Sequence, residues 1–232
     1  MFNEEKNAEK CVVEVMKVLT HLRPSTNLLI VNDGSTDNTG SVLSQMKKKY
    51  TNLTVVINKS NGGYGAALQT GIKKALELRF TYGLFMDSDL TNDPIFIKNF
   101  VTQLKRGVDC VKASRYIKGG GMINVPYYRQ FISIVGNMIA RSLFGINVND
   151  CSNGFRMVRL SLLKNIIFKQ QNFSIIMEEL YYLKKKGATF MEIPNVLTAR
   201  KNTLSKFRYY PSIFWDYLKY PLMAFFVKYN PK

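Results

Sequence analysis

The stretch Leu28-Leu29-Ile30-Val31-Asn32-Asp33-Gly34-Ser35-Thr36-Asp37 decides the fold class. Four consecutive apolar residues are typical of a strand buried on both faces, and the Asn-Asp-Gly that follows predicts a turn at its end. Before this strand, apolar residues from Val12 to Leu22 recur at helical spacing, which predicts a helix that begins near Glu4. We therefore expect the chain to open with a helix followed by a buried strand.

The same alternation of helix and strand patterns continues to about residue 114. We predict further strands over residues 53–57, 83–86 and 110–114, separated by helices that end near residues 50, 78 and 106. Strands that alternate with helices of this length indicate an α/β fold with a doubly wound, mostly parallel sheet. Such a sheet usually opens with a central strand, so we expect the first strand to be missing, as in a fragment or a chain with a misplaced start.

Three polar turns follow the predicted strands. They are Asn32-Asp33, the segment 58–65, and Asp87 to Asp89. The carboxyl ends of parallel strands meet at one edge of a doubly wound sheet, and ligands bind there. We therefore expect the active site at this edge.

Asp87-Ser88-Asp89 is the most informative of the three turns. Two carboxylates at the end of a buried strand can hold a hard divalent cation through oxygen. Such a cation bridges a diphosphate and neutralises the charge that develops as the diphosphate leaves. A turn with two solvated acids is the alternative, but the apolar strand before it and the Asp93-Pro94 helix start after it favour a metal site.

The other two turns have both a binding and a structural interpretation. Asn32 to Asp37 offers acceptors for a ribose or a base, or else it caps the helix that follows. Asn61-Gly62-Gly63-Tyr64-Gly65 could let backbone N–H groups approach a phosphate, although glycines before a helix are a weak signal alone.

Charge divides the chain into two unequal halves. The 232 residues hold 33 Lys and Arg against 16 Asp and Glu, a formal net charge of +17. Residues 98–232 hold 22 basic and 6 acidic residues, so this half carries +16 of the total. An imbalance of this size implies an anionic partner for the second half, either nucleic acid, an acidic membrane face or a phosphorylated substrate.

Arginine, lysine and serine side chains of the basic half are candidate phosphate ligands, although for any one basic residue alone a solvated surface cation is the favoured interpretation. A sugar hydroxyl acceptor would also need a carboxylate base, for which Asp150 and Glu178 are candidates. A phosphate acceptor is already ionised and needs none. The candidate phosphate ligands are Ser114, Arg115, Arg129, Ser133, Arg156, Arg200, Ser205 and Lys206.

Several classes of protein are disfavoured. The three cysteines form no CxxC pair, which argues against a zinc site or a disulfide framework and for a reducing compartment. With His21 as the one histidine and no GxSxG motif, a histidine-based triad has no support. The start lacks a signal-peptide pattern, and the most apolar segments, 131–144 and 212–229, are predicted as core or interfacial helices.

Taken together, the motifs resemble those of the family 2 glycosyltransferases. In the first half the resemblance rests on Phe2-Asn3-Glu4-Glu5, Val31 to Asp37, Asn61 to Ala67 and Asp87-Ser88-Asp89-Leu90. The second half resembles the dolichol-phosphate mannose synthase branch. Its motifs are Ser114-Arg115-Tyr116, Gly119 to Gly121, Arg129 to Ser133, Asp150 to Arg156, Glu178, Glu192-Ile193-Pro194, and Arg200 with Ser205-Lys206.

The resemblance implies a fold and a role for each motif. The fold is the A-type nucleotide-sugar fold. We expect one domain over residues 1–210, with a donor and metal half (1–97) and an acceptor half (98–210). An amphipathic aromatic tail over 211–232 follows it. Asp87 and Asp89 would hold Mg²⁺ or Mn²⁺ and would act in catalysis together with Arg200. Donor binding would involve Asn3, Glu4, Asp33, Gly34, Asn61 and Gly63. The acceptor phosphate would be bound by Ser114, Arg115, Arg129, Ser133, Ser205 and Lys206.

These observations lead to one expected function and three alternatives. We expect an inverting, metal-dependent glycosyltransferase that moves mannose or glucose from a nucleotide sugar to a polyprenyl or dolichyl phosphate. A transferase that acts on a glycan hydroxyl is the first alternative, and an inactive remnant is the second. A basic nucleic-acid-binding module is the third, but the chain has no recognised nucleic-acid motif, and we expect no nucleic-acid partner.

The basic half also carries aromatic residues near its end, including Trp215, Tyr217 and Phe226. A basic surface interleaved with aromatic side chains suits an anionic membrane face. We therefore expect a cytoplasmic protein that attaches peripherally to a membrane and is released by high salt.

Overall fold

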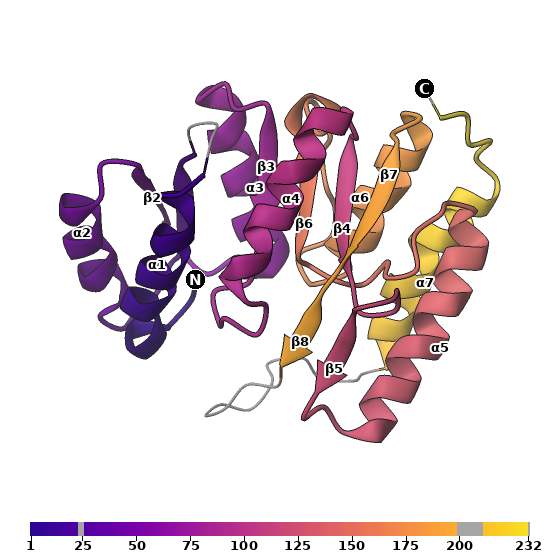
Figure 1. Ribbon diagram of the computed structural model, residues 1–232, viewed down its shortest axis with the longest axis horizontal. Helices are drawn as coiled ribbons and strands as arrows, with labels where there is room; N and C mark the ends of the chain where they lie inside the picture. Colours follow the sequence, from indigo (N-terminus) through magenta and orange to yellow (C-terminus); the bar gives the residue numbers. More distant parts are fainter. Residues whose placement is uncertain (23–25, 199–210, 232) are drawn as a thin grey trace.

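The computed structural model describes residues 1–22, 26–198 and 211–231 and has an α/β architecture (Figure 1). The helices are α1 (Glu5–Leu19), α2 (Thr39–Lys49), α3 (Gly63–Glu77), α4 (Ile97–Gln103), α5 (Tyr127–Phe144), α6 (Ile175–Lys185) and α7 (Pro211–Phe225). The strands are β1 (Leu28–Asp33), β2 (Leu53–Asn58), β3 (Tyr82–Phe85), β4 (Cys110–Ser114), β5 (Gly121–Ile123), β6 (Arg156–Arg159), β7 (Phe190–Pro194) and β8 (Val196–Thr198). Short 3₁₀-helices cover Pro94–Phe96, Leu104–Arg106 and Leu160–Leu162.

The predicted elements of the first half are confirmed, with small shifts at their ends. The apolar runs form β1 and β2, which pair in parallel from Leu28 opposite Leu53 to Asp33 opposite Asn58. β4 has the predicted bounds, and all of its residues are buried. The helix predicted over 94–106 is divided into a 3₁₀ turn, α4 and a second 3₁₀ turn.

The largest sheet has four strands in the order β3-β6-β4-β7. β7 runs parallel to β4, whereas β6 lies between β3 and β4 and is antiparallel to both. β6 was not predicted, because Arg156-Met157-Val158-Arg159 has a charged residue at each end and no long apolar run. β5 and β8 form a separate parallel pair.

Met1 lies beside the end of β1 as a residue of a parallel strand would. Its ammonium nitrogen donates to the Val31 carbonyl oxygen at 2.6 Å, and the N–H of Asp33 donates to the Met1 carbonyl oxygen at 2.8 Å. Among the described residues, β1 pairs in a sheet only with β2, and β3 only with β6. Within the described residues, no strand joins these two sheets.

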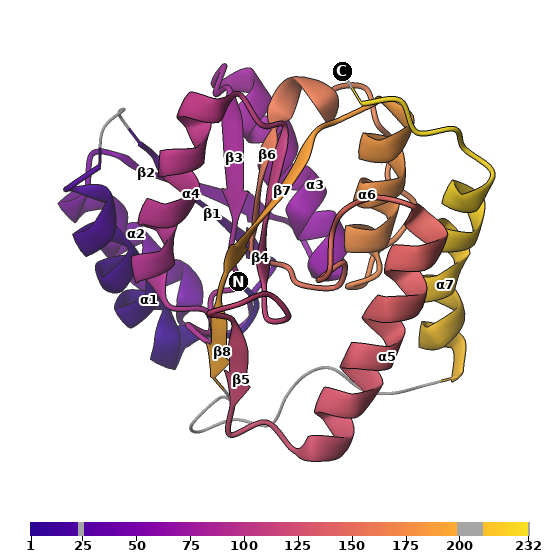
Figure 2. The same cartoon turned by 45° about the vertical axis from the view of Figure 1, so that its right-hand side comes forward.

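The helices enclose three hydrophobic clusters against the sheets. One includes Met16 of α1 and Phe100 of α4, and a second lies around α3, α6 and β6. In the third, Phe144 of α5, Leu180 of α6 and Tyr220 of α7 pack together. α5 and α7 lie side by side at the end of the molecule opposite α2 (Figures 1 and 2). The aromatic tail thus contains a helix that packs on the rest of the chain, while the boundary at residue 210 stays a prediction.

Candidate functional site

Asp33 is buried at the end of β1 and holds the turn that follows β2. Its Oδ1 accepts hydrogen bonds from Asn58 Nδ2 at 2.7 Å and from the N–H of Gly62 at 3.3 Å, and its Oδ2 accepts from the N–H of Gly63 at 3.0 Å. Gly34 has a φ of +65°, and a Cβ there would lie 2.4 Å from the backbone of the turn after β2. The first two polar turns therefore touch each other at one edge, as predicted.

Asn3 and Glu4 join the start of the chain to the same edge. The N–H of Asn3 donates to Ser35 Oγ at 3.0 Å, and Asn3 Oδ1 accepts from the N–H of Thr36 at 2.9 Å. Glu4 is buried, and its N–H donates to Thr39 Oγ1 at 2.8 Å. Both residues order the loop after β1, and their contact with a donor stays a prediction.

The first turn of α3 packs closely against a loop of the second half. The N–H of Gly65 donates to the Gln171 carbonyl oxygen at 2.8 Å, and a Cβ on Gly65 would lie 2.2 Å from the Gln170 carbonyl oxygen. The N–H groups of Gly62 and Gly63 already donate to Asp33. These glycines therefore permit close packing rather than an open phosphate cradle, and donor binding by the predicted residues of this turn, Asn61 and Gly63, stays a prediction.

Gly65→Ala is expected to lower the free energy of unfolding by about 1–3 kcal/mol, because the added Cβ would overlap backbone that cannot rotate away. Gly136→Ala is the matched control. Gly136 lies exposed within α5 with nothing within 4 Å of an added Cβ, so alanine should stabilise the helix by about 0.5–1 kcal/mol. Urea unfolding of both variants measures the two changes, and a Gly65→Ala protein as stable as the parent would contradict the close contact.

Asp87 and Asp89 are half-buried directly after β3. Asp89 Oδ1 accepts from the N–H and the hydroxyl of Thr91 at 3.0 and 2.8 Å, which fixes the loop. Gly154 faces Asp87, since a Cβ there would lie 3.7 Å from Asp87 Oδ2 and 3.1 Å from the Tyr64 hydroxyl. Burial raises the pKa of Tyr64, and the Asp87 carboxylate raises it further. A protonated Tyr64 therefore lies near Asp87.

Electrostatics also connect Asp89 with the start of the chain. Burial raises the pKa of the Cys11 thiol to about 12, the terminal ammonium of Met1 lowers it, and the carboxylates of Asp89 and Glu4 raise it. Met1, Met86 and Leu90 pack against the same hydrophobic cluster as Cys11, so the loop after β3 and the start of the chain are neighbours. The predicted donor and metal residues are thus gathered at one edge.

Ser114, Arg115 and Ser133 gather where β4 ends beside α5. Arg115 Nε and Nη2 donate to Asp150 Oδ2 and Oδ1, each at 2.7 Å. Burial lowers the pKa of Arg115, but its neighbours, Asp150 foremost, together raise that pKa above its usual value. Burial raises the pKa of Asp150, but Arg115 and Lys112 together lower it below its usual value. The Ser133 hydroxyl lies 2.6 Å from that of Tyr116, whose N–H donates to Ser114 Oγ. This acceptor cluster is assembled, and its contact with a phosphate stays a prediction.

The remaining predicted acceptor and closing residues have different outcomes. Arg129 lies one helical turn before Ser133 on α5, and its Nε donates to the Tyr128 hydroxyl at 3.1 Å. Arg200, Ser205 and Lys206 lie outside the described residues.

The segment from Asp150 to Arg156 connects the acceptor cluster with Asp87. In the middle of this segment, the backbone carbonyl oxygen of Asn153 accepts a hydrogen bond from the buried Lys112 Nζ at 2.8 Å. The side-chain Nδ2 of Asn153 donates to the Ala113 carbonyl oxygen at 3.0 Å. Burial and the nearby Arg156 guanidinium lower the pKa of Lys112. Since Gly154 follows at once and borders Asp87, β4 positions this segment between the two halves of the site.

Arg156 corrects one expectation. It is 0% exposed, and its Nε and Nη2 donate to the equally buried Glu179 at 2.5 and 2.8 Å, while Nη1 donates to the Gly154 carbonyl at 2.7 Å. The prediction of Arg156 as a phosphate ligand is wrong, because this guanidinium is enclosed and bonded within the protein.

All six acidic residues of the second half accept hydrogen bonds. Asp150 and Glu178, the two candidate bases, are each 0% exposed. Glu178 accepts from the N–H groups of Lys169 and Gln170, each at 2.9 Å, and so holds the loop that packs on α3. Of the other four carboxylates, Asp109 accepts from Arg159 and Glu179 accepts from Arg156. Glu192 accepts from Asn149 and from the N–H of Asp150, and Asp216 accepts from Asn172.

The carboxylates after β3 fit a cation that the substrate helps to hold. Within residues 1–22, 26–198 and 211–231, no three His, Cys, Asp or Glu side chains gather as a complete metal site. Mg²⁺ is commonly bound by one or two carboxylates together with substrate phosphates and water, and a pair such as Asp87 and Asp89 fits that donor set. Their binding of a metal stays a prediction. Glycine at 154 leaves room beside Asp87 Oδ2 that a Cβ would take.

Comparison with known proteins assigns the family. The family model described as "Glycosyl transferase family 2" matches residues 1–167, which include the donor edge, Asp87, Asp89 and the acceptor cluster. The chain belongs to glycosyl transferase family 2.

Two curated proteins of similar sequence have names that refer to a polyprenol or dolichol phosphate and to mannose. The chain is 26% identical over 209 residues to the polyprenol monophosphomannose synthase of Mycolicibacterium smegmatis, which covers 88% of this chain and 77% of that protein. It is 29% identical to the dolichol-phosphate mannosyltransferase of Pyrococcus furiosus over 89% of this chain. The chain spans only 57% of the length of that archaeal relative.

Solved structures share the fold of this glycosyltransferase. Glucosyl-3-phosphoglycerate synthase from Mycobacterium tuberculosis, in complex with Mn²⁺, UDP-glucose and phosphoglyceric acid, has a TM-score of 0.68 at 17% identity. The match covers 98% of this chain and 78% of that one. The same enzyme with Mn²⁺, UDP and its product has a TM-score of 0.65 over 88% and 70% of the two chains, at 18% identity. The expected A-type α/β fold is thereby confirmed.

Asn137 is a site residue that sequence reasoning missed. It is buried on α5, its Nδ2 donates to Ser152 Oγ at 2.9 Å, and its Oδ1 accepts from the N–H of Ser152 at 3.0 Å. Ser152 Oγ in turn accepts from Arg115. The available signal was the polar side chain of Asn137 itself, within a mostly apolar segment, 131–144, that was predicted only as a core or interfacial helix.

Proposed function

We propose that this glycosyltransferase moves mannose or glucose from a nucleotide sugar to a polyprenyl phosphate, with inversion at the anomeric carbon. The observation that carries the proposal is the state of Asp150 and Glu178, which are buried and bonded within the protein. A sugar hydroxyl would need a carboxylate base, whereas a phosphate is already ionised at neutral pH. The names of the two curated relatives support the same acceptor class.

The donor would lie at the edge formed by the loops after β1, β2 and β3. Asp87 and Asp89 would hold Mg²⁺ or Mn²⁺, which when bound neutralises charge on the diphosphate. Asn3, Glu4, Asp33, Gly34, Asn61 and Gly63 would surround the donor, as the family resemblance implies.

The acceptor would lie at the cluster between β4 and α5. Arg115 and Arg129, with Ser114 and Ser133, would orient the lipid phosphate, and Arg200, Ser205 and Lys206 would close over the diphosphate. A phosphate oxygen forms the new bond to the anomeric carbon while the bond from that carbon to the diphosphate oxygen breaks. The products are a glycosyl phospholipid and a nucleoside diphosphate, and correct positioning supplies much of the rate enhancement.

We also propose that the protein works on the cytoplasmic face of a membrane, as a peripheral protein. None of the helices in the described ranges is long and apolar enough to cross a membrane. The basic second half and its lipid phosphate acceptor support attachment to an anionic lipid surface.

Product analysis tests the proposed reaction. The purified protein is incubated with radiolabelled GDP-mannose or UDP-glucose, Mg²⁺ or Mn²⁺, and a polyprenyl phosphate. We expect label in a butanol-extractable lipid that mild acid releases as free sugar. Label in a lengthened glycan would support transfer to a hydroxyl instead, and tight, steeply salt-dependent DNA binding without any transfer would support the nucleic-acid alternative.

A further inference from the structure

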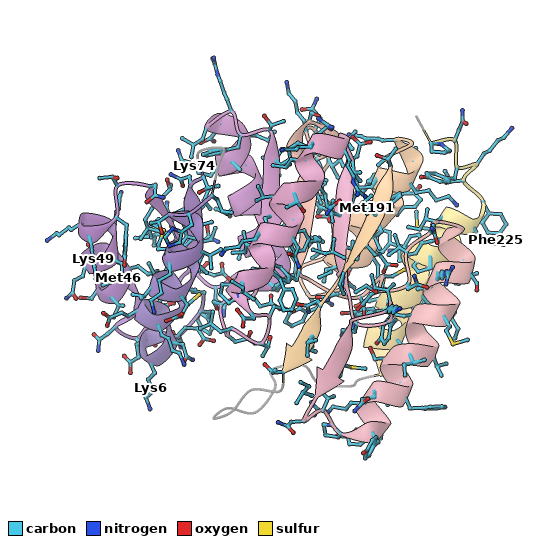
Figure 3. All side chains as sticks on the ribbon, viewed as in Figure 1. Lys6, Met46, Lys49, Lys74, Met191 and Phe225 are labelled. Carbon is cyan, nitrogen blue, oxygen red and sulfur yellow. The ribbon has the colours of Figure 1, made fainter. Side chains whose placement is uncertain are left out.

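Exposed apolar side chains are concentrated on one side of this protein. Of the eighteen large hydrophobic side chains that are exposed in the described ranges, thirteen belong to α5, to α7 or to the residue directly after α7. Phe225, at the end of α7, points away from the rest of the molecule (Figure 3). We name this surface the helix-pair face and define it by Phe131, Ile134, Met138, Trp215, Leu222 and Phe226.

α5 has its apolar side outward, the reverse of an ordinary surface helix. Phe131 and Met138 are 68% and 64% exposed, and Ile134 lies between them at helical spacing. The opposite side carries Ser133, which contacts Tyr116 at the acceptor cluster, and the buried Asn137. A continuous exposed apolar face of this kind marks an interaction site.

Charge around the helix-pair face favours a lipid partner. α5 contains Arg129 and Arg141 and no acidic residue. α7 contains one acid, Asp216, which accepts from Asn172, and Lys228 is exposed shortly after the helix. Residues 127–144 and 211–228 contain Arg129, Arg141, Lys219 and Lys228 but only one acid, Asp216, so this side has an excess of positive charge together with apolar and aromatic groups. That combination suits an anionic bilayer surface, whereas two copies of a basic face repel each other.

We propose that the helix-pair face lies in the interface of an anionic membrane, with α5 and α7 along the bilayer surface and their apolar side chains among the lipids. The inference deepens the proposed function and rests on it. α5 then separates lipid on its outer side from the acceptor cluster on its inner side. A phosphate at the membrane surface needs only to pass the start of α5, where Arg129 lies, to reach Ser133 and Arg115.

Trp215 reports on this surface directly, because it is the one tryptophan of the chain and is 61% exposed. Vesicles of phosphatidylcholine mixed with phosphatidylglycerol should shift its fluorescence to shorter wavelength. Vesicles of phosphatidylcholine alone, or high salt, should give a smaller shift. An unchanged spectrum with anionic vesicles at low salt would overturn the proposal.

A matched pair of variants tests the face itself. Phe131→Gln with Met138→Gln should weaken co-sedimentation with the anionic vesicles by about tenfold or more, since each exposed side chain then loses its lipid contact. Ile57→Gln is the control, because Ile57 is also 68% exposed but lies on β2. Equal vesicle binding by the double variant and the parent would overturn the proposal.

Two further measurements separate this surface from the proposed reaction and from self-association. The double variant should transfer sugar normally to a short, water-soluble polyprenyl phosphate and poorly to a long one in vesicles. If the parent binds vesicles through this face but transfers sugar to no polyprenyl phosphate, the proposed function fails and the membrane face stands. The proposal would be overturned if the parent is a dimer, the double variant is a monomer, and the double variant binds vesicles as well as the parent does. These results would identify the helix-pair face as a protein interface.

Discussion

Arg156→Met is expected to lower the free energy of unfolding by about 3–5 kcal/mol, the largest stability loss we expect from one substitution. Arg156 and Glu179 are both 0% exposed and are joined by hydrogen bonds of 2.5 and 2.8 Å. Burial lowers the pKa of Arg156, but Glu179 raises it by more, so the guanidinium stays charged. Its removal would leave the Glu179 carboxylate enclosed without a cation, and the Gly154 carbonyl without a donor.

Two controls make the expectation specific to the buried pair. Arg156→Met combined with Glu179→Leu removes both charges and should recover most of the lost stability, because apolar side chains can replace a buried ion pair. Lys17→Met removes one partner of an exposed pair with Glu14 and should change stability by less than about 1 kcal/mol. Urea unfolding measures all three, and an Arg156→Met loss no larger than that of Lys17→Met would show that the pair is not stabilising.

The same ion pair also fixes the geometry of the candidate site. The Arg156 guanidinium lies 4.6 Å from the centre of the Phe85 ring at the end of β3, and it donates to Gly154. Asp87 follows Phe85 by two residues, and Gly154 borders Asp87. The buried pair therefore joins the loop of Asp87 and Asp89 to the segment 150–156.

The convergence of the polar turns could be predicted because it depends on local patterns. A continuous apolar run located β1, and the alternation of helix and strand patterns located β2 and β4. Parallel strands end at one edge of a sheet, which predicted that Asp33 and the turn after β2 lie close together. The family resemblance then predicted roles for these residues. Asp33 and the turn after β2 lie at the edge after β1 and β2, and Ser114, Arg115 and Ser133 lie together where β4 ends beside α5.

The pairing of charges could not be predicted, because the partners are far apart in the sequence. Arg156 and Glu179 are separated by 23 positions, and Arg115 and Asp150 by 35. An arginine followed by no nearby acid is interpreted as a surface cation or a phosphate ligand. For Arg156 this interpretation was wrong, and for the same reason β6 was not predicted. Arg156 can start a buried strand because the carboxylate of Glu179, far away in the sequence, compensates its charge.

The direction in which α5 faces was likewise hidden in its sequence. Apolar residues at helical spacing predict a helix, and they normally mark its buried side. Here Asn137 and Ser133 lie on the inner side because Ser152 and Tyr116 accept or donate hydrogen bonds there. Those partners come from other elements, so only the folded chain shows which side of the helix is outward.

Asp89→Asn is expected to lower kcat of sugar transfer by about 10²–10³-fold, because the loss of one metal ligand removes several kcal/mol of charge stabilisation from the departing diphosphate. Asparagine keeps an oxygen that can accept from the N–H and hydroxyl of Thr91, as Asp89 Oδ1 does at 3.0 and 2.8 Å. The loop should therefore keep its shape while the charge is lost. Asp89→Ala removes charge and acceptor together and should abolish transfer.

Asp93→Asn is the matched control for this substitution. Asp93 lies in the same loop, is exposed, and accepts from the N–H of Ile95 at 2.8 Å, a contact that asparagine can keep. It should leave transfer unchanged, which separates loss of a metal ligand from loss of any negative charge near the site.

Mn²⁺ binding in the presence of nucleoside diphosphate, measured by electron paramagnetic resonance, should weaken in Asp89→Asn and Asp87→Asn but not in Asp93→Asn. In the proposed site Asp87 and Asp89 hold the metal together with the diphosphate, so binding without the diphosphate should be weak even in the parent. Full transfer in excess EDTA would remove the metal from the mechanism altogether.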